Sequence, residues 1–425
     1  MIIFSVTIHN GSLEKLSLFS PSKKLEPLVS SMRAVFAQYK EGENMLNASF
    51  YHKYTYKLLY VGLLIFSTTF VFCIAVTKPG IQGCCKSTVL TMVNGTADKP
   101  FMYRVLLPFI ANKIIVNMPE KTRNTIAQVT KNNTMLKPIF ADRKWPIKYA
   151  SEYYVVLILM YASLWGFVFS LKYFFRGLFK TSERFVDAVS VLAVLSLPCL
   201  YWPYTYIYDF TTLFLFTLGL ATMVRRKWIS YLFIFVLACI NKETTILLTC
   251  IYAIHFFKHQ KLKVSTYIML LFVQIAMFVS IKIFIDALFI HNPGTFVEFW
   301  LKRNIILLLR PYPIILYLQW FALGFFIIYK WSEKPLFLKH GLLILIPLLG
   351  TTLFWGWINE LRDYYEVYPI VILLISHSMA RILHVGINTQ LSSGPDHQWS
   401  LGKDQYSPRE SKVAVGHPNA EVQNV

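Results

Sequence analysis

Ionisable side chains that could do chemistry interrupt an otherwise apolar sequence in a few short motifs. Asp209 follows an aromatic turn, Lys242 and Glu243 stand together inside an apolar stretch, and Glu360 lies two residues before Arg362. Charged groups within apolar membrane segments are costly, so they normally face the protein interior or water and often mark a functional site. Carboxylates of this kind can act as general bases or position a substrate.

Each motif also has a structural interpretation, which stays open at the level of the sequence. Asp209 at the start of a helix would favour the positive end of the helix dipole. Lys242 and Glu243 could pair with each other or with another helix and so fix a break in the chain. The functional interpretation is a site formed where a broken helix exposes its ends.

Two arginines add an anion-binding possibility. Arg104 follows Pro100 in a segment between apolar runs, and the planar donors of Arg104 and Arg362 could together grip a phosphate or pyrophosphate. Interfacial arginines also meet lipid phosphates without any further role. Lys282 and Asp286 lie four residues apart in one apolar run, so we expect them to neutralise each other.

Long apolar runs must position these motifs. The 425 residues are 55% hydrophobic and only 15% charged, with a mean hydropathy of +0.48. A soluble domain could not cover so much apolar surface. Lipid offers no partner to an unpaired backbone group, so runs long enough to cross a membrane should be helices. The sequence therefore predicts an all-α, polytopic transmembrane protein with about ten spanning segments.

The expected segments are 58–77, 153–171, 186–203, 206–223, 228–241, 244–257, 266–290, 312–330, 341–358 and 366–384. We expect a polar leader at 1–55, a transmembrane helical domain at 56–385 and a disordered tail at 386–425, which is rich in Ser, Gly, Pro and charges. The segments 228–241 and 244–257 are short for a membrane crossing, and one long helix through both is the alternative.

Basic residues predict the orientation. They concentrate in the short loops around 172–184, 225–227, 258–263 and 330–339 and at Arg381, which all fall on one side if 228–257 contains two segments. The positive-inside rule makes that side cytoplasmic, together with both termini. The excess of 42 basic over 22 acidic residues then suits anionic lipid headgroups rather than nucleic acid. We expect the membrane to be a bacterial plasma membrane or that of the endoplasmic reticulum.

The long segment 78–152 becomes the first outer loop in this arrangement. Within it, Phe101 to Val116 places apolar residues near one helical face, which predicts an amphipathic helix in the outer interface. All the motifs above also fall at or near the outer surface. Their gathering on one side favours a single site there.

These motifs resemble those of multi-pass bacterial proteins of the GT-C glycosyltransferase type. The similar stretches are Pro-Phe-x-Tyr-Arg-x-Leu-x-Pro at Pro100 to Pro108, Tyr208-Asp209-Phe210, Asn241-Lys242-Glu243-Thr244 and Glu360-Leu361-Arg362. GT-C enzymes take a sugar from a polyprenyl-phosphate donor at the outer or lumenal membrane face. Their long first outer loop carries interfacial helices and supplies an acidic catalytic residue.

The resemblance implies roles for the polar residues. Asp98, the first-loop carboxylate nearest the motif, would be the general base. Asp209 and Glu243 would help to position the acceptor or a metal, and the arginines would stabilise the leaving lipid phosphate. The candidate residues are thus Asp98, Asp209 and Glu243 for catalysis and Arg104, Lys242, Glu360 and Arg362 for substrate binding; the sequence names no cofactor and no metal ligand set.

Two other classes of function remain open from the residues. The break within 228–257 is compatible with a transporter or lipid flippase, which would need polar groups along a path through the membrane. The third possibility is a non-catalytic multi-pass membrane protein. No nucleotide-binding loop, nucleophile elbow or zinc-protease motif occurs in the sequence.

Overall fold

The computed structural model describes residues 54–82, 87–259, 262–295 and 297–389. The chain divides into two compact units, Met1–Ile65 and Phe66–Val425. Of the first unit, only the helical residues 54–65 are described, and the predicted leader otherwise lies outside the described residues. So do residues 390–425 of the predicted tail and Lys261 in the predicted basic loop.

The described chain is almost entirely helical, as the apolar runs predicted. Four helical stretches are long and apolar enough to cross a membrane, judged by length and composition. They are Tyr54–Val76, Ile147–Leu178 (η3, Ile147–Tyr149, and α7, Ala150–Leu178), Val264–Leu288 (α12) and Leu336–Trp355 (α15, Leu336–Leu342, and α16, Leu345–Trp355). The chain thus has the helices of an integral membrane protein.

The other expected segments also contain helices, each 14 to 16 residues long: α8 (Glu183–Ser196), α9 (Asp209–Val224), α10 (Trp228–Asn241), α11 (Ile246–His259), α14 (Ile314–Ile328) and α17 (Tyr368–Ile382). At 1.5 Å per residue such helices reach only about 21–24 Å, less than the roughly 30 Å of a hydrocarbon core. Their length alone does not carry them across a membrane.

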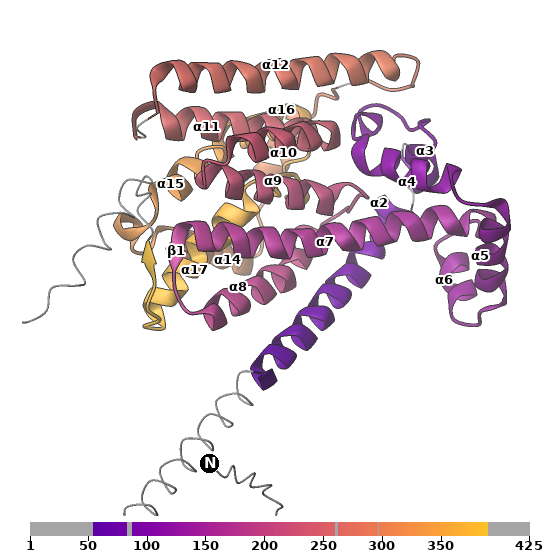
Figure 1. The fold of residues 1–425 in the computed structure, drawn as a ribbon, viewed down its shortest axis with the longest axis horizontal. Helices are drawn as coiled ribbons and strands as arrows, with labels where there is room; N and C mark the ends of the chain where they lie inside the picture. The colour runs from indigo at the N-terminus through magenta and orange to yellow at the C-terminus, as the bar shows by residue number, and fades with distance from the viewer. Residues whose placement is uncertain (1–53, 83–86, 260–261, 296, 390–425) are drawn as a thin grey trace, which may run out of the picture. The chain divides into compact units, whose positions relative to one another are not determined.

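The core of the Phe66–Val425 unit is a layered helix bundle. Helix α7 packs along α9, α9 along α10, and both α10 and α11 along α12 (Figure 1). Glycines allow close approach in two places: a Cβ at Gly166 would lie 2.8 Å from the Phe214 ring, and one at Gly219 would lie 2.8 Å from Leu248. Small residues at helix contacts are the usual means of close packing between membrane helices.

The chain reverses direction between α10 and α11. Trp228, at the start of α10, contacts Tyr252 and Phe256 in the later part of α11, with ring centroids 5.7 and 5.3 Å apart. The short helix η5 (Glu243–Thr245) forms the turn. The structure therefore contains a pair of short helices here and not one long helix. The turn carries Lys242 and Glu243.

The predicted first outer loop folds into short helices: α2 (Pro79–Gln82), α3 (Val89–Val93), η2 (Phe101–Tyr103), α4 (Leu106–Val116), α5 (Glu120–Asn132) and α6 (Leu136–Asp142). The expected helix from Phe101 to Val116 begins instead at Leu106, because Val105 donates its N–H to the carbonyl of Ile240 (3.1 Å). Helix α4 buries Leu107 and Ile115 but exposes Phe109 and Ile114.

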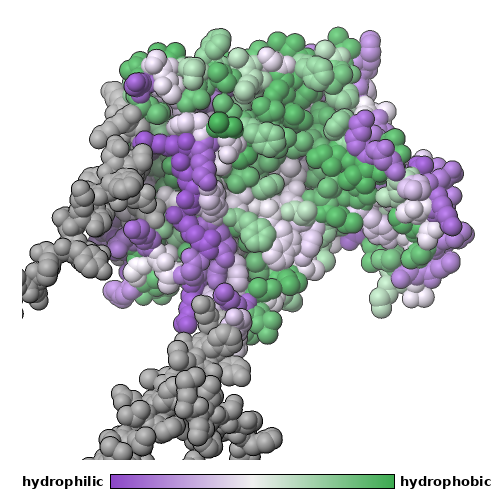
Figure 2. Space-filling model, viewed as in Figure 1, coloured by the Kyte–Doolittle hydropathy of each residue, from purple (hydrophilic) through white to green (hydrophobic). Residues whose placement is uncertain are grey.

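The remaining elements are η4 (Leu197–Leu200), α13 (Leu301–Leu308), η6 (Trp331–Glu333), η7 (Leu361–Tyr364) and two short strands, β1 (Phe179–Lys180) and β2 (Asn388–Thr389), which pair antiparallel. Strand β2 and the buried Ile387 belong to the first residues of the predicted tail. Figure 2 shows a hydrophobic band over the bundle, with hydrophilic residues gathered toward two ends.

Candidate functional site

Four segments that are distant in the sequence bring charged side chains together at one end of the bundle. Arg104 lies before α4, Asp209 begins α9, Lys242 and Glu243 form the α10–α11 turn, and Glu360 to Glu366 precede α17. We call the resulting set the charge cluster. Its members are Arg104, Asp209, Lys242, Glu243, Glu360, Arg362, Asp363 and Glu366. The cluster contains every predicted site residue except Asp98.

Arg104 joins the first loop to the α10–α11 turn. Its Nη2 donates to Oε1 of Glu243 over 2.8 Å, and its Nη1 donates to the phenol oxygen of Tyr208. Only 8% of Arg104 is exposed. The Glu243 side chain keeps 31% of its surface exposed, so the pair is only partly buried. The pair joins the segment before α4 to the α10–α11 turn.

Arg362 joins the segment before α17 to the start of α9. Its Nη2 donates to Oε2 of Glu360 over 3.0 Å, and its Nη1 lies 3.6 Å from Oδ1 of Asp209 and 3.7 Å from Oδ1 of Asp363. Asp209 also accepts the N–H of Tyr206 through Oδ2 (2.7 Å). Asp209 stands in the first turn of α9, as the dipole interpretation expects, but its carboxylate bonds to the preceding turn, and no side chain caps the start of the helix.

Lys242 pairs with a residue that the sequence did not single out. Its Nζ lies 3.0 Å from Oε1 of Glu366, and the side chains are 3% and 0% exposed. The Thr244 hydroxyl donates to the same carboxylate. Lys242 and Glu243 therefore pair with other segments and not with each other. The one signal for Glu366 in the sequence is its position directly before an apolar run.

Two tyrosines support the arginines. The guanidinium of Arg104 lies over the Tyr208 ring (4.6 Å to the centroid), and that of Arg362 lies over the Tyr206 ring (4.3 Å). The two rings are 5.6 Å apart and nearly parallel. Such contacts favour the cationic side chain and fix the plane of its donors. Alternation of Tyr204, Tyr206 and Tyr208 is the sequence signal for this arrangement, because alternate residues of an extended segment share a face.

The charges of the cluster hold both arginines in the cationic state. Burial alone would lower the pKa of Arg104, but Glu243 and Tyr208 outweigh burial and raise that pKa above its usual value. The balance for Arg362 is similar, with Asp363 and Glu360 raising its pKa. Burial raises the pKa of the Glu360 carboxyl although Arg362 opposes the shift. Both guanidinium groups are therefore permanent hydrogen-bond donors.

Several buried polar atoms of the cluster have no hydrogen-bond partner among the described residues. They include Nε of Arg104, Nε and Nη1 of Arg362, Oδ1 of Asp209, and Oε2 of Glu243 and of Glu366. Buried polar atoms are nearly always satisfied by protein or water, so a group of unsatisfied ones needs an explanation. The cluster has hydrogen-bonding capacity that a polar ligand or water could use.

Asp98 lies apart from these ion pairs. It is half-buried, and its carboxylate makes no hydrogen bond or ion pair with any residue that the structure describes. Its carbonyl accepts the N–H of Met102 (3.2 Å) at the start of the turn that delivers Arg104. Next to it, Lys99 is held by the carbonyls of Ile290 (3.0 Å, from Nζ) and Pro293 (2.8 Å, from the backbone N–H). The Asp98 carboxylate is thus unpaired in the described structure, on a segment that the hydrogen bonds of Lys99 hold in place.

The expected mutual neutralisation of Lys282 and Asp286 is wrong. Lys282 donates to the carbonyl of Cys239 (2.7 Å), near the end of α10, and Asp286 accepts the hydroxyl of Tyr103 (2.6 Å). The carbonyls at a helix C-terminus attract a cation, and this contact competes successfully with a neighbour on the same helix. Helix α12 therefore holds both segments that carry Arg104 and Glu243.

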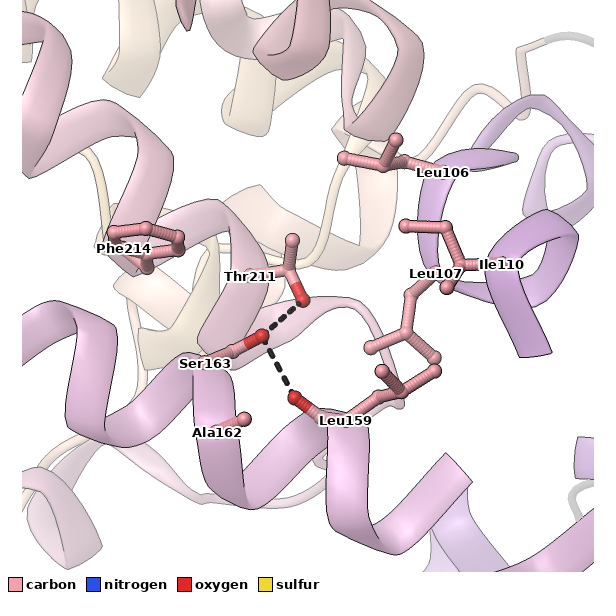
Figure 3. Close-up of a pocket in the computed structure, with 8 residues that line it drawn as sticks. All are labelled: Leu106, Leu107, Ile110, Leu159, Ala162, Ser163, Thr211 and Phe214. Carbon is pink, nitrogen blue, oxygen red and sulfur yellow. Dashed lines mark hydrogen bonds between the residues drawn. The ribbon is translucent and has the colours of Figure 1, made fainter. Parts of the chain in front are cut away.

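An apolar cavity of about 180 Å³ lies between α4, α7 and α9. Figure 3 shows its lining from α4 (Leu106, Leu107, Ile110), α7 (Leu159, Ala162, Ser163) and α9 (Thr211, Phe214). Its polar groups are the hydroxyls of Ser163 and Thr211, 2.9 Å apart. In the sequence, the lining begins two residues after Arg104 and two after Asp209. The cavity suits an apolar group.

The described part of the chain holds no group of three or more His, Cys, Asp or Glu side chains arranged to bind a metal ion. The site is therefore characterised by its arginines, its carboxylates and its apolar cavity. In comparisons with known proteins, no family model, no curated protein and no solved structure matches this chain.

Proposed function

We propose that the chain is an integral membrane glycosyltransferase that transfers a sugar from a polyprenyl-phosphate-linked donor at the outer or lumenal membrane face. The observation that carries the proposal is the convergence of Arg104 and Arg362 on one charge cluster, together with an apolar cavity lined by α4 and α9, which follow Arg104 and Tyr208 in the chain. A lipid-linked sugar phosphate has matching parts: an apolar chain, an anionic phosphate and a polar sugar.

The donor phosphate would bind the two guanidinium groups. Nε of Arg104 and Nε and Nη1 of Arg362 are donors without hydrogen-bond partners in the described structure. Planar guanidinium groups suit phosphate oxygens and would stabilise the charge that develops on the leaving phosphate. The five carboxylates of the cluster exceed its three cations, so the phosphate would share Arg104 with Glu243 and Arg362 with Glu360.

The prenyl chain would occupy the cavity between α4, α7 and α9. Its lining is apolar apart from Ser163 and Thr211, which bond to each other. A cavity of this size holds only the first part of a long prenyl chain. The exposed apolar residues Phe109 and Ile114 of α4 would contact the remaining lipid.

Asp98 would be the general base. A base needs a carboxylate that can reach the acceptor, and those of Asp209, Glu243 and Glu360 are engaged by arginines. The acceptor hydroxyl would give its proton to Asp98 as its oxygen bonds to the anomeric carbon. The bond from that carbon to the phosphate oxygen breaks, and the lipid phosphate leaves with the electron pair.

The proposed orientation is that of a protein with ten membrane-spanning segments, both termini in the cytoplasm and the charge cluster outside. The antiparallel α10–α11 pair and the gathering of the predicted motifs at one end support it. A small epitope tag inserted next to Lys261 tests it. The tag should be protected from an external protease in intact cells; cleavage from outside would contradict the orientation.

A transfer assay in membranes that contain the overproduced chain tests the function. A radiolabelled polyprenyl-phosphate sugar is the donor, and the label released from the lipid is counted. We expect Asp98→Asn and Arg104→Ala to abolish transfer, because the first removes the base and the second a phosphate ligand. Asp142→Asn, which alters an exposed carboxylate of the same loop, is the matched control. Full transfer by Asp98→Asn, Arg104→Ala and Glu243→Gln would contradict the proposal.

The reversal at the α10–α11 turn favours a second candidate, a transporter or lipid flippase, since interrupted helices form many transport sites. Such a protein needs a polar path through the membrane. Two cavities of the described structure both border α4. Reconstituted protein that moves a fluorescent lipid between leaflets without sugar transfer would favour this candidate.

A further inference from the structure

A row of aromatic rings leads away from the charge cluster. Phe101 contacts Tyr206 (ring centroids 5.1 Å apart), Tyr206 contacts Tyr204 (6.2 Å), Tyr204 contacts Trp357 (6.1 Å) and Trp357 contacts Trp300 (5.5 Å). We call these five residues the aromatic track. It begins three residues after Asp98 and passes beside Arg362, which covers the Tyr206 ring. The track thus connects the proposed base to a more distant surface.

The far end of the track is rigidly built. Asn304 of α13 is fully buried. The two hydrogens of its Nδ2 are shared among the carbonyls of Thr352 (3.1 Å), Leu353 (2.8 Å) and Gly356 (2.8 Å), while its Oδ1 accepts the N–H of Ile358 (3.2 Å). These contacts of one side chain fasten the loop that carries Trp357. A fixed aromatic surface binds with little loss of side-chain entropy.

Polar groups border the outer part of the track. The Arg303 guanidinium lies 3.9 Å from the centroid of the Trp357 ring, and its Nη2 is 3.4 Å from Oδ1 of Asn359. Its Nη1 has no hydrogen-bond partner among the residues described. Tyr204, Trp300 and Trp357 are each half-buried. Aromatic surface and polar donors and acceptors are therefore available side by side.

This combination fits a carbohydrate. A sugar ring has C–H groups on its faces, which stack on the negative faces of aromatic rings, and hydroxyls on its rim, which bond to guanidinium and amide groups. A lipid-facing aromatic belt would present exposed tryptophans without such a polar border. Trp202, which is 64% exposed and makes no ring contact within the described chain, has that character.

We propose that the aromatic track binds the saccharide of the acceptor, so that the acceptor is an oligosaccharide and not a simple lipid or a polypeptide. The proposal rests on the proposed glycosyltransferase function and specifies its acceptor. An acceptor sugar stacked on Phe101 and Tyr204 would lie near Asp98, and further sugars would extend toward Trp357 and Trp300. The site would therefore prefer chains of several sugars to a monosaccharide.

Binding to the full chain in detergent micelles tests this proposal without any transfer reaction. The probes are linear tetrasaccharides of glucose, of mannose and of N-acetylglucosamine, detected by saturation-transfer NMR. We expect at least one probe to bind, with affinity about tenfold lower in Trp357→Ala because a stacking contact is lost. Trp357→Phe, which keeps an aromatic face, should retain most of the affinity. Trp202→Ala should bind as the parent does.

The outcomes separate the two proposals. Failure of all three probes to bind, or an equal loss of affinity in Trp202→Ala and Trp357→Ala, would overturn the carbohydrate track. If the track variants lose binding while Asp98→Asn keeps full transfer, the track stands and the assignment of the base falls. If Asp98→Asn abolishes transfer and Trp357→Ala binds every probe normally, the track alone is refuted.

Discussion

The two hydrophilic ends of the helix bundle use buried charge differently. At the charge cluster, residues from four distant segments meet, and carboxylates outnumber cations. We call the end that carries the basic loops around 172–184, 225–227 and 330–339 and Arg381 the basic end. There, Lys334 is buried without a carboxylate and donates to the carbonyl of Leu374 (2.6 Å), the hydroxyl of Ser378 (2.7 Å) and the carbonyl of Phe326 (3.4 Å). The three donors of this ammonium are thereby used.

The other ion pairs of the basic end are separate pairs, and that of Arg381 with Glu333 (2.8 Å) joins η6 to the end of α17. Lys172 pairs with Asp187 between the adjacent helices α7 and α8, and Arg176 pairs with Glu183 at the surface. Buried polar atoms without a hydrogen-bond partner in the described structure also occur here, namely both ring nitrogens of His377 and Nε of Arg225 and of Arg381. They belong to three side chains, whereas in the charge cluster such atoms belong to six: Arg104, Asp209, Lys242, Glu243, Arg362 and Glu366. The comparison indicates that the basic end fastens helices, while the charge cluster has bonding capacity to spare for a ligand.

Removing Arg362 should have the largest effect on both stability and function. Arg362→Ala leaves Asp209 and Glu360 buried without their cation, a loss of about 3–5 kcal/mol for a broken buried pair. We expect a strongly lowered midpoint of thermal unfolding, measured by tryptophan fluorescence in detergent, and no sugar transfer. Arg362→Lys should restore part of the stability but little transfer, because lysine lacks the planar donors. Equal transfer by Arg362→Lys and the parent would contradict the proposed phosphate contact.

The Lys242–Glu366 pair should show strong coupling. Lys242→Met alone leaves a buried carboxylate and should cost about 3 kcal/mol or more, whereas Lys242→Met combined with Glu366→Gln should recover most of this loss. The measurement is a double-mutant cycle on the unfolding midpoint. Additive effects of the two substitutions would show that the pair does not exist as described.

A substitution of Lys334 tests the basic end, and its effect on stability should be smaller. Lys334→Met removes a donor from three acceptors and should cost about 1–3 kcal/mol, the usual range for leaving buried acceptors unpaired. Sugar transfer per folded molecule should stay at the parental value. Loss of transfer in a folded Lys334→Met protein would contradict the assignment of a purely structural role to the basic end and of ligand binding to the charge cluster.

The smallest effect should follow from Arg176→Ala. The side chains of Arg176 and Glu183 are 44% and 65% exposed. Exposed pairs of this kind contribute about 0–1 kcal/mol, so neither the unfolding midpoint nor transfer should change measurably. A shift as large as that of Lys334→Met would show that the surface pair has a structural role that its exposure does not suggest.

The sequence predicted the all-helical class from its apolar runs, and it predicted the meeting of the motifs for one physical reason. Successive apolar runs reverse direction, so motifs at alternate run ends, such as those of Asp209 and Glu243, fall at the same end. It did not predict their partners. Lys242 meets Glu366, and Arg104 meets Tyr208, because of how each helix is rotated about its axis. This rotation cannot be deduced from a single sequence. The spacing of Lys282 and Asp286 predicted a pair that does not form, because Lys282 instead binds a carbonyl near the C-terminus of α10.

The aromatic track could not be predicted from the sequence for a related reason. Trp357 and Tyr204 are separated by more than a hundred residues. Trp357 stands in a loop that Asn304 of α13 binds through the carbonyl of Gly356. The segment Tyr201 to Asp209 was recognisable as distinctive, but its aromatic residues also fit an interfacial belt. Only the position of the rings relative to Arg303 and Arg362 separates the two interpretations.

The lipid that copurifies with the chain tests the central claim most directly. Purified parent, Arg104→Ala and Lys334→Met proteins would be extracted with organic solvent, and the extracts analysed by mass spectrometry for polyprenyl phosphates and their sugar conjugates. We predict enrichment of such a lipid with the parent and with Lys334→Met, and its loss with folded Arg104→Ala protein. No enrichment over bulk phospholipid in the parent, or equal enrichment in Arg104→Ala, would contradict the claim that the charge cluster binds a lipid-linked phosphate.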